Sequence, residues 1–171
     1  PSDKVVGYGR EVQIGQLPIT KDSLIGVRLQ QKSSCRLRIH SVKLPAPNRK
    51  IVSLHTTSAA KTIDRIIDVF PAEEKDMVRT MLSESLQAVI SQTLLKKEGG
   101  GRVAAHEIMI GIPAIRNLIR ENKVAQMYSA IQTGANHGMT TLDQSLKGLV
   151  SRGVISPQTA RTAAKQPESF L

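Results

Sequence analysis

Residues 55–110 read HTTSAAKTIDRIIDVFPAEEKDMVRTMLSESLQAVISQTLLKKEGGGRVAAHEIMI, and this stretch decides the fold. Its first part places apolar side chains at the spacing of one helical face, at Ile63, Ile66, Ile67 and Phe70. This spacing predicts an amphipathic helix. The helix must end before Pro71, because the residue ahead of a proline disfavours helical backbone.

A second helix is expected to open at Pro71 and to run to about Ser91. Proline suits the first helical position, and the acidic residues that follow it favour the positive end of the helix dipole. The apolar face of this helix would consist of Val78, Leu82, Leu86 and Val89. Two apolar-rich runs within residues 93–110 then flank Gly99-Gly100-Gly101, a pattern that predicts a β-hairpin.

Helical signals continue beyond the hairpin, after Gly111-Ile112-Pro113 has broken its second strand. Apolar spacing predicts a short helix on Ile115, Leu118 and Ile119 and another on Val124, Met127 and Ile131, with Gly134 as its C-cap. Thr141 and Gln144 form a capping box for a helix that ends at Gly153. Ser156-Pro157 opens a last helix to about Lys165, and the tail after Gln166 is expected to fray.

The amino-terminal third differs from this pattern. Residues 1–54 hold ten basic and three acidic residues, whereas residues 55–171 hold fourteen and eleven, so most of the net charge of +10 lies at the start. Short β-like pieces such as EVQIGQL and SLIGVRL stand among scattered Gly and Pro. We therefore expect two parts: an atypical, basic, irregular or β-like and poorly folded segment at 1–50, and a folded unit at 51–171 with an edge strand at 51–54.

Composition excludes several function classes. Aromatic residues make up 2 % of the chain and Trp is absent, so the stacking surfaces of single-stranded nucleic-acid binders are missing and no nucleic-acid partner is expected. A single cysteine, Cys35, excludes an internal disulfide and a cysteine-based metal cluster, and we interpret it as inert. No apolar run approaches the roughly 20 residues that span a bilayer. A soluble, cytoplasmic protein without a bound metal is expected.

Few residues have the context of a functional site. His55, Thr56 and Thr57 stand where the apolar run Ile51–Leu54 gives way to a helix, whose free N–H groups could face an anion. Spacing alone favours residues that cap the helix, next to a histidine without a functional role. His106 and Glu107 are neighbours in a strand, so they point to opposite faces and do not form a pair.

Two further groups receive a structural interpretation. His137 lies in a loop between glycines and is given no role. Four charged residues of the first helix have the spacing of i, i+3 and i+4 pairs, which explains them without a function. These residues are Lys61, Asp64, Arg65 and Asp68.

Three long segments resemble a known family. HTTSAAKTIDRIIDVFPAEEKDMVRTMLSESLQAVISQTLL, GRVAAHEIMIGIPAIRNLIRENKVAQMYSAIQTG and MTTLDQSLKGLVSRGVISP are similar to the twitching-motility ATPases of the secretion-ATPase superfamily. The resemblance covers about residues 54–170. It implies an α/β fold, the carboxy-terminal portion of a RecA-like P-loop ATPase core, here mostly helical with a β-hairpin.

The resemblance also implies site residues. His55 corresponds to the histidine of the family's His box, near the terminal phosphate of the nucleotide, and Thr56 and Thr57 adjoin it. The AIRNLIRE segment corresponds to the helix that couples ATP turnover to pilus retraction, and the side chains that do not face the core would lie at its surface. Without the resemblance this helix would be an ordinary solvated face. Its residues are Ala114, Ile115, Arg116, Asn117, Leu118, Ile119, Arg120 and Glu121.

The family role is ATP-driven disassembly of the type IV pilus by a hexamer that uses ATP and Mg²⁺. The motor lies in the cytoplasm, peripheral to the inner membrane at the pilus base, and its partners are the inner-membrane pilus machinery. Catalysis in such a motor needs a G-x-x-x-x-G-K-[ST] loop and an acidic Walker B strand. No window of the chain matches that loop, and neither Walker B nor the family's Asp box precedes LHT, where the sequence reads QQKSSCRLRIHSVKLPAPNRKIVSL. We expect the chain alone to be inactive and to bind no nucleotide.

Three origins fit residues 1–50: a natural fusion, a degraded gene copy or a shifted reading frame, of which the last two are favoured. An alternative function is a non-catalytic basic module that binds anions or other subunits. Loss of the family's central strands would expose apolar surface. Marginal stability or association with other chains is therefore expected.

Overall fold

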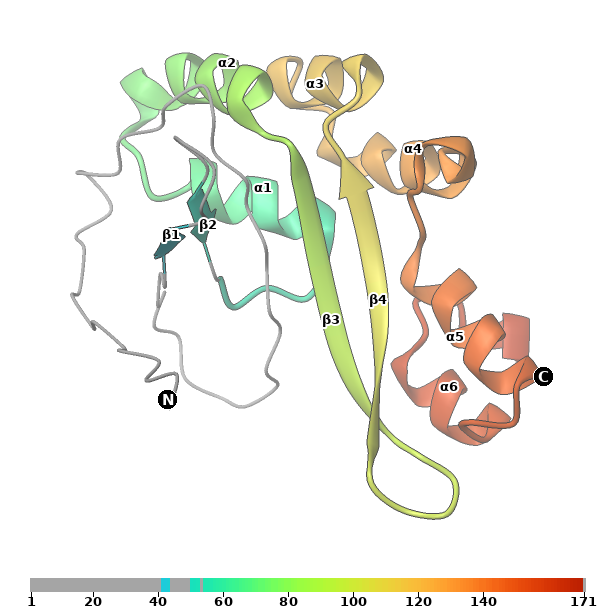
Figure 1. The fold of residues 1–171 in the computed structure, drawn as a ribbon. Coiled ribbons are helices and arrows are strands. Elements are labelled where there is room, and N and C mark those ends of the chain that lie inside the picture. The colour runs from blue at the N-terminus through green and yellow to red at the C-terminus, as the bar shows by residue number, and fades with distance from the viewer. Residues whose placement is uncertain (1–40, 44–49, 53, 171) are drawn as a thin grey trace.

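The computed structural model describes residues 41–43, 50–52 and 54–170, with side chains described from Leu54 to Phe170. Figure 1 shows a long two-stranded hairpin around which the helices are arranged. The predictions for Cys35 and for the rest of residues 1–40 and 44–49 lie outside the described residues. The two short strands before the folded part, β1 (Ser41–Lys43) and β2 (Lys50–Val52), pair antiparallel with each other.

The first predicted helix is confirmed as α1, Ala59–Ile67. Ser58 is its N-cap, and its side-chain oxygen accepts a hydrogen bond from the N–H of Lys61. Ile63 and Ile67 are buried, while Phe70 lies beyond the last helical residue and still packs on the same core. The helix thus ends before Pro71, as predicted.

The second helix is shorter than predicted. A 3-10 turn at Ala72–Glu74 leads into α2, Lys75–Ser85, and Leu86 already has extended backbone with ψ of 124°. Val89 is buried as expected, but in a strand and opposite Met109. The helical spacing of Val78, Leu82, Leu86 and Val89 was therefore misleading, because strand pairing over nine residues outweighs a weak local helical preference.

The hairpin is confirmed and is longer than its sequence signal. Strands β3 (Ala88–Lys96) and β4 (Arg102–Ile110) pair antiparallel from Ala88 opposite Ile110 to Lys96 opposite Arg102. The three glycines at 99–101 all have positive φ, the conformation that favours glycine. At the other end Gly111 donates its N–H to the Gln87 carbonyl at 2.7 Å, and a Cβ there would lie 2.3 Å from the Leu86 carbonyl oxygen.

Four helices follow the hairpin, and short 3-10 turns join α3 to α4 and α4 to α5. They are α3 (Pro113–Arg120), α4 (Met127–Thr133), α5 (Leu142–Ser151) and α6 (Pro157–Ala163). The predicted caps are confirmed: Gly134 is the C-cap of α4, Thr141 and Gln144 form a capping box on α5, and Ser156 is the N-cap of α6. Gly153 lies just beyond α5 with φ of 65°.

Helix α6 ends at Ala163, close to the predicted end near Lys165, and the N–H groups of Lys165 and Gln166 donate to the Asp143 carboxylate. The prediction for the tail beyond it was wrong. The tail after Gln166 does not fray. It forms a 3-10 turn, Pro167–Phe170, and Phe170 packs against the core formed by α5 and α6.

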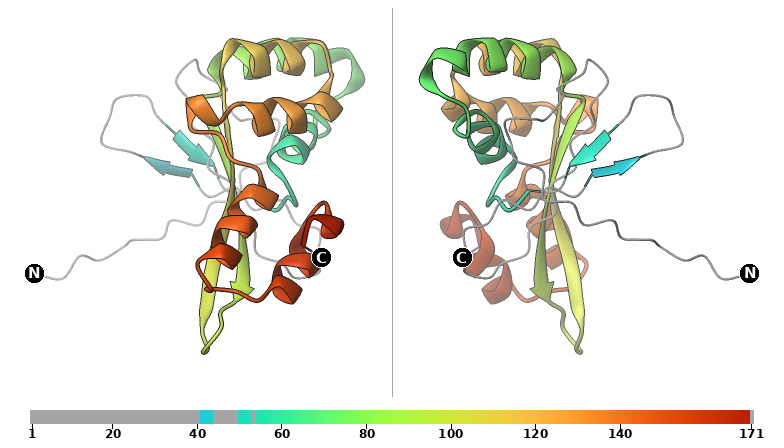
Figure 2. Two further views of the ribbon diagram at one scale, coloured as in Figure 1. Left: turned by 90° about the vertical axis from the view of Figure 1, so that its right-hand side faces the viewer. Right: turned by 90° about the vertical axis from the view of Figure 1, so that its left-hand side faces the viewer.

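Two hydrophobic clusters hold the described part together. One joins α1 to α4 with the base of the hairpin, and the other joins α5 and α6 with the half of the hairpin near its turn. Figure 2 shows this division, with α2, α3 and α4 gathered at one end of the hairpin and α5 and α6 toward the other. Leu54, which directly precedes His55, is buried in the first cluster.

Candidate functional site

The segment that leads into α1 alternates between buried and exposed side chains. Leu54, Thr56 and Ser58 are buried, whereas His55 and Thr57 are exposed. His55 makes no hydrogen bond or ion pair with any residue of the described part of the chain. Of the three residues implied by the resemblance, two therefore face solvent and one faces the core.

Thr56 serves the local structure. Its hydroxyl oxygen lies 2.7 Å from that of Thr62, and the Thr62 hydroxyl donates to the Ser58 carbonyl at 2.9 Å. Buried hydroxyls need such partners, because an unpaired polar group away from water is costly. Thr56 thus fixes the entry of the chain into α1.

Two N–H groups in the first turn of α1 already donate to protein oxygens. The N–H of Lys61 donates to Ser58 Oγ at 3.2 Å, and the N–H of Ala59 donates to Glu107 Oε2 at 3.3 Å. Neither group is available to a bound anion. The prediction that free N–H groups at this helix end face an anion therefore does not apply to these two groups. A phosphate group beside the segment would meet the exposed His55 and Thr57 side chains.

Glu107 is the residue that the sequence interpretation missed. It is 1 % exposed, and besides accepting from Ala59 it forms an ion pair with Lys165, with 2.9 Å between Oε1 and Nζ. The prediction that His106 and Glu107 do not act as a pair stands, because their positions alternate along β4. The available signal was an acidic residue between the buried positions Ala105 and Met109 of the same strand face.

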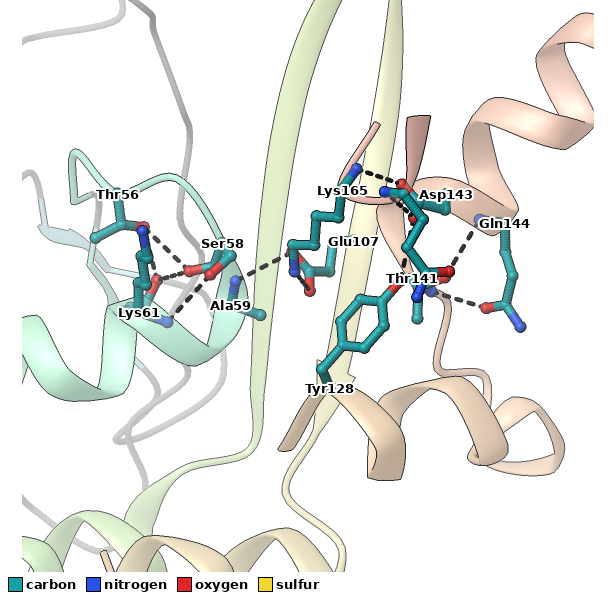
Figure 3. Close-up of polar contacts among 12 residues, drawn as sticks. Thr56, Ser58, Ala59, Lys61, Glu107, Tyr128, Thr141, Asp143, Gln144 and Lys165 are labelled. Atoms are coloured by element: carbon teal, nitrogen blue, oxygen red, sulfur yellow. Dashed lines mark hydrogen bonds and ion pairs between the residues drawn. The ribbon is translucent and has the colours of Figure 1, made fainter. Parts of the chain in front are cut away.

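The network continues from Lys165 into the carboxy-terminal helices, as Figure 3 shows. The Lys165 ammonium lies 4.5 Å from the centre of the Tyr128 ring. The Tyr128 hydroxyl donates to Asp143 Oδ2 at 3.2 Å, and Asp143 accepts the N–H of Lys165 at 2.8 Å. Burial and the neighbouring Asp143 carboxylate raise the pKa of Tyr128 above its usual value of 10.0.

The first seven residues of the segment AIRNLIRE form helix α3 together with the preceding Pro113, and Glu121 is the C-cap of this helix. Ile115 and Ile119 are fully buried and Leu118 is partly buried, as the apolar spacing predicted. Ala114, Asn117, Arg120 and Glu121 are exposed. Arg120 donates to the Asn117 side chain, and Glu121 pairs with Lys123 at 2.8 Å, a contact that lowers the pKa of Glu121.

Arg116 departs from the predicted orientation. It is half-buried, and it donates from Nε to the Gly111 carbonyl and from Nη1 to the Ser83 carbonyl, each at 2.6 Å. A further contact from Nη1 reaches the Glu84 carbonyl. Arg116 thus caps the carboxyl end of α2, whose last carbonyls have no intrahelical partner.

The remaining candidates have no contacts that suggest chemistry. His137 is exposed. Asp68 pairs with Lys75 of α2 at 2.9 Å, and burial together with nearby Asp68 raises the pKa of Asp64. In residues 54–170 no three His, Cys, Asp or Glu side chains gather as a metal site would require. No described helix has the length and hydropathy needed to cross a bilayer.

Comparison with known proteins supports the resemblance. No protein-family profile matches the chain. Over 118 residues the chain is 78 % identical to the type IV pilus retraction ATPase PilT of Pseudomonas aeruginosa, covering 69 % of this chain and 34 % of that protein. Over 119 residues it is 64 % identical to the twitching motility protein of Neisseria gonorrhoeae, covering 69 % and 32 %.

A solved structure agrees with these relatives. The crystal structure of the pilus retraction motor PilT with bound ADP matches with a TM-score of 0.62 and 45 % identity, over 70 % of this chain and 33 % of that one. The predicted fold class, a partial α/β ATPase domain that is mostly helical with a β-hairpin, is confirmed. The chain spans about one third of the length of the relatives it matches.

Proposed function

We propose that residues 54–170 serve as the carboxy-terminal part of a type IV pilus retraction ATPase, whose role is ATP-driven disassembly of the pilus. The observation that carries this proposal is the 78 % identity over 118 residues to a protein named for that role. Identity at that level over a contiguous segment implies the same local structure and the same surfaces.

In this proposal His55 and Thr57 lie near the terminal phosphate of a bound nucleotide, and Thr56 orders the segment that presents them. Support comes from the exposure of His55 and Thr57 and from the burial of Thr56. An imidazole N–H without a partner among the described residues, as at His55, can donate a hydrogen bond to a phosphate oxygen. ATP and Mg²⁺ would be the ligands of the assembled motor.

Helix α3 would be the coupling element of the same motor. Asn117, Arg120 and Glu121 form its exposed side and are available to a neighbouring subunit or to the pilus machinery at the inner membrane. Ile115 and Ile119 anchor the helix on the core. The assembly would be a hexamer in the cytoplasm, at the base of the pilus.

The 171-residue chain would not turn over ATP by itself. Its sequence has no G-x-x-x-x-G-K-[ST] window, and the backbone N–H groups and the lysine of that loop are what hold the phosphates of such enzymes. Purified chain incubated with ATP and Mg²⁺ should release phosphate at the background rate. Turnover at a rate typical of a motor would contradict the proposal.

The division into a basic segment at 1–50 and an ATPase-like unit at 51–171 belongs to the same proposal. The matches cover 69 % and 70 % of the chain, which agrees with a unit of that size. Limited proteolysis should yield a stable fragment that begins near residue 51. The alternative of a basic binding module depends on residues 1–54, and no described contact favours it.

A chimera tests the proposal directly. Residues 54–171 would replace the matching segment of the P. aeruginosa relative, and both ATP turnover and twitching would be measured in a strain that lacks its own copy. We expect both activities to be retained. His55→Ala should lower ATP turnover, whereas an Arg120→Ala, Glu121→Ala double variant should keep turnover and lose twitching.

The chimera carries its own control. Ser151→Ala alters an exposed residue of α5 and should leave both activities unchanged. Loss of ATP turnover in the unmutated chimera would reject the proposed function of residues 54–170. Full turnover in His55→Ala would reject the role of that residue.

A further inference from the structure

The buried carboxylate of Glu107 is shared between two distant parts of the chain. One oxygen accepts the N–H of Ala59 at 3.3 Å, at the start of α1, and the other pairs with Lys165 at 2.9 Å, just beyond α6. Glu107 itself lies on β4 and is 1 % exposed. Figure 3 shows Glu107 between the start of α1 and the Lys165 side chain.

Lys165 is held on several sides. Its backbone N–H donates to Asp143 Oδ1 at 2.8 Å, and its ammonium lies 4.5 Å from the centre of the Tyr128 ring. Tyr128 is fixed in turn by its hydrogen bond to Asp143. The ammonium is therefore placed by groups from α4 and α5, and little further rotamer entropy is lost when it pairs with Glu107.

The two contacts of Glu107 depend on each other. A carboxylate out of water is tolerated when it is paired and hydrogen-bonded, and removal of one partner leaves a buried charge without compensation. The start of α1 supplies the positive end of a helix dipole, which also attracts a negatively charged group. Loss of Lys165 therefore weakens the bond to Ala59 as well.

The bond from Ala59 to Glu107 lies directly after the segment that contains His55. Ser58 caps the helix, Thr56 bonds within its first turn, and the exposed His55 is the residue before Thr56. The contacts of Glu107 also link the two hydrophobic clusters. Its partner Ala59 belongs to the first cluster, and its partner Lys165 follows α6, which belongs to the second.

We propose that Glu107, held by Lys165, is a positioning residue for the segment His55–Ser58, so that the carboxy-terminal helices fix where this segment lies. The part that concerns nucleotide contact rests on the proposed function of His55. The link between Lys165 and the start of α1 does not, and it can be measured without nucleotide.

The test is amide hydrogen exchange on the full 171-residue chain. Lys165→Met keeps the apolar stem of the side chain and removes its charge. We expect exchange of the Ala59 amide to rise about tenfold or more, the factor for loss of a hydrogen bond to a charged group. Exchange in α2 and α3 should rise by less than about threefold, because no residue of these helices forms a hydrogen bond or ion pair with Glu107 or Lys165.

Lys75→Met is a closely matched control. Lys75 pairs with Asp68 at the same 2.9 Å, its side chain is 30 % exposed against 32 % for Lys165, and Asp68 stands at the other end of α1. Its acceptor is 66 % exposed rather than 1 %. This control should leave exchange at Ala59 within about twofold of the unmutated chain, since exposed pairs contribute little.

Two more variants separate positioning from general stability. Lys165→Arg restores a cation and should return exchange at Ala59 to within about threefold of the unmutated chain. An equal rise in α1, α2 and α3 on Lys165→Met would indicate a purely structural role and overturn the proposal, as would no rise at Ala59. If Lys165→Met does not fold, Glu107→Gln replaces it in the experiment. Unchanged exchange at Ala59 in Glu107→Gln would also overturn the proposal.

The outcome is independent of the proposed function. A chimera in which His55→Ala has no effect on ATP turnover would remove the nucleotide role of His55 and leave the exchange result intact. Unchanged exchange at Ala59 with reduced turnover in that chimera would remove the positioning role and leave the proposed function intact.

Discussion

Arg116→Ala should destabilise the chain far more than the loss of an ordinary surface arginine would. Its guanidinium donates two hydrogen bonds of 2.6 Å, to the Gly111 and Ser83 carbonyls, and has a further contact with the Glu84 carbonyl. A hydrogen bond to a charged group contributes about 1.5–3 kcal/mol, and removal of the donor leaves carbonyls without a partner. Because Arg116 is only half-buried, we expect a loss of about 2–4 kcal/mol in the free energy of unfolding.

Urea unfolding followed by circular dichroism at 222 nm measures this loss. The midpoint should shift down while the slope stays constant, the pattern expected for a change in stability alone. Arg116→Lys keeps the charge without the planar guanidinium, and its urea midpoint should lie between those of the unmutated chain and Arg116→Ala. Arg120→Ala on the same helix removes an exposed side chain and should change stability by less than about 0.5 kcal/mol. An Arg116→Ala variant as stable as Arg120→Ala would refute the role of Arg116 as a cap on α2.

Three further results are expected. Gly111→Ala should cost about 2 kcal/mol or more, because its Cβ would lie 2.3 Å from a backbone oxygen, whereas Gly148→Ala, with open space around it in α5, should stabilise by about 0.5–1 kcal/mol in the same urea assay. The raised pKa of Tyr128 means that its phenol should ionise above pH 10.0, seen as absorbance at 295 nm once the chain's other tyrosine is changed to Phe; the stability it contributes is present below pH 10.0 and is lost as the pH rises above that value. Ile90 and Leu94 are 41 % and 37 % exposed on one face of β3, so lysine at either position should reduce any concentration-dependent mass seen by light scattering, and an unchanged mass would exclude this face as the cause.

Local signals identified most of the described elements. Capping is the clearest case, because Ser58, Thr141 and Ser156 each satisfy a donor within three residues of themselves, and such a contact depends on nearby sequence alone. The glycine turn of the hairpin and the buried side of α3 are equally local. These local features specify the order of most elements without reference to tertiary contacts.

The errors arose where distant residues decide the structure. Helix α2 stops at Ser85 because the next residues pair with β4, and its helical spacing gave no sign of that partner. The carboxy-terminal tail is ordered because Asp143 accepts two N–H groups that follow α6. Glu107 and Arg116 were misjudged for the same reason, since their partners lie from 5 to 58 residues away and most of them more than 30.

Contacts along the hairpin reach each group of helices. Arg116 binds the Gly111 carbonyl at its base, Glu107 holds the start of α1 from the middle of β4, and the N–H of Glu98 near its turn donates to the Val154 carbonyl between α5 and α6 at 2.9 Å. Because β3 and β4 pair over nine residues each, these contacts lie along or next to one continuous antiparallel ladder. The segment at His55, helix α3 and the carboxy-terminal helices therefore each contact the same hairpin, and displacement of any one of them would break one of these contacts.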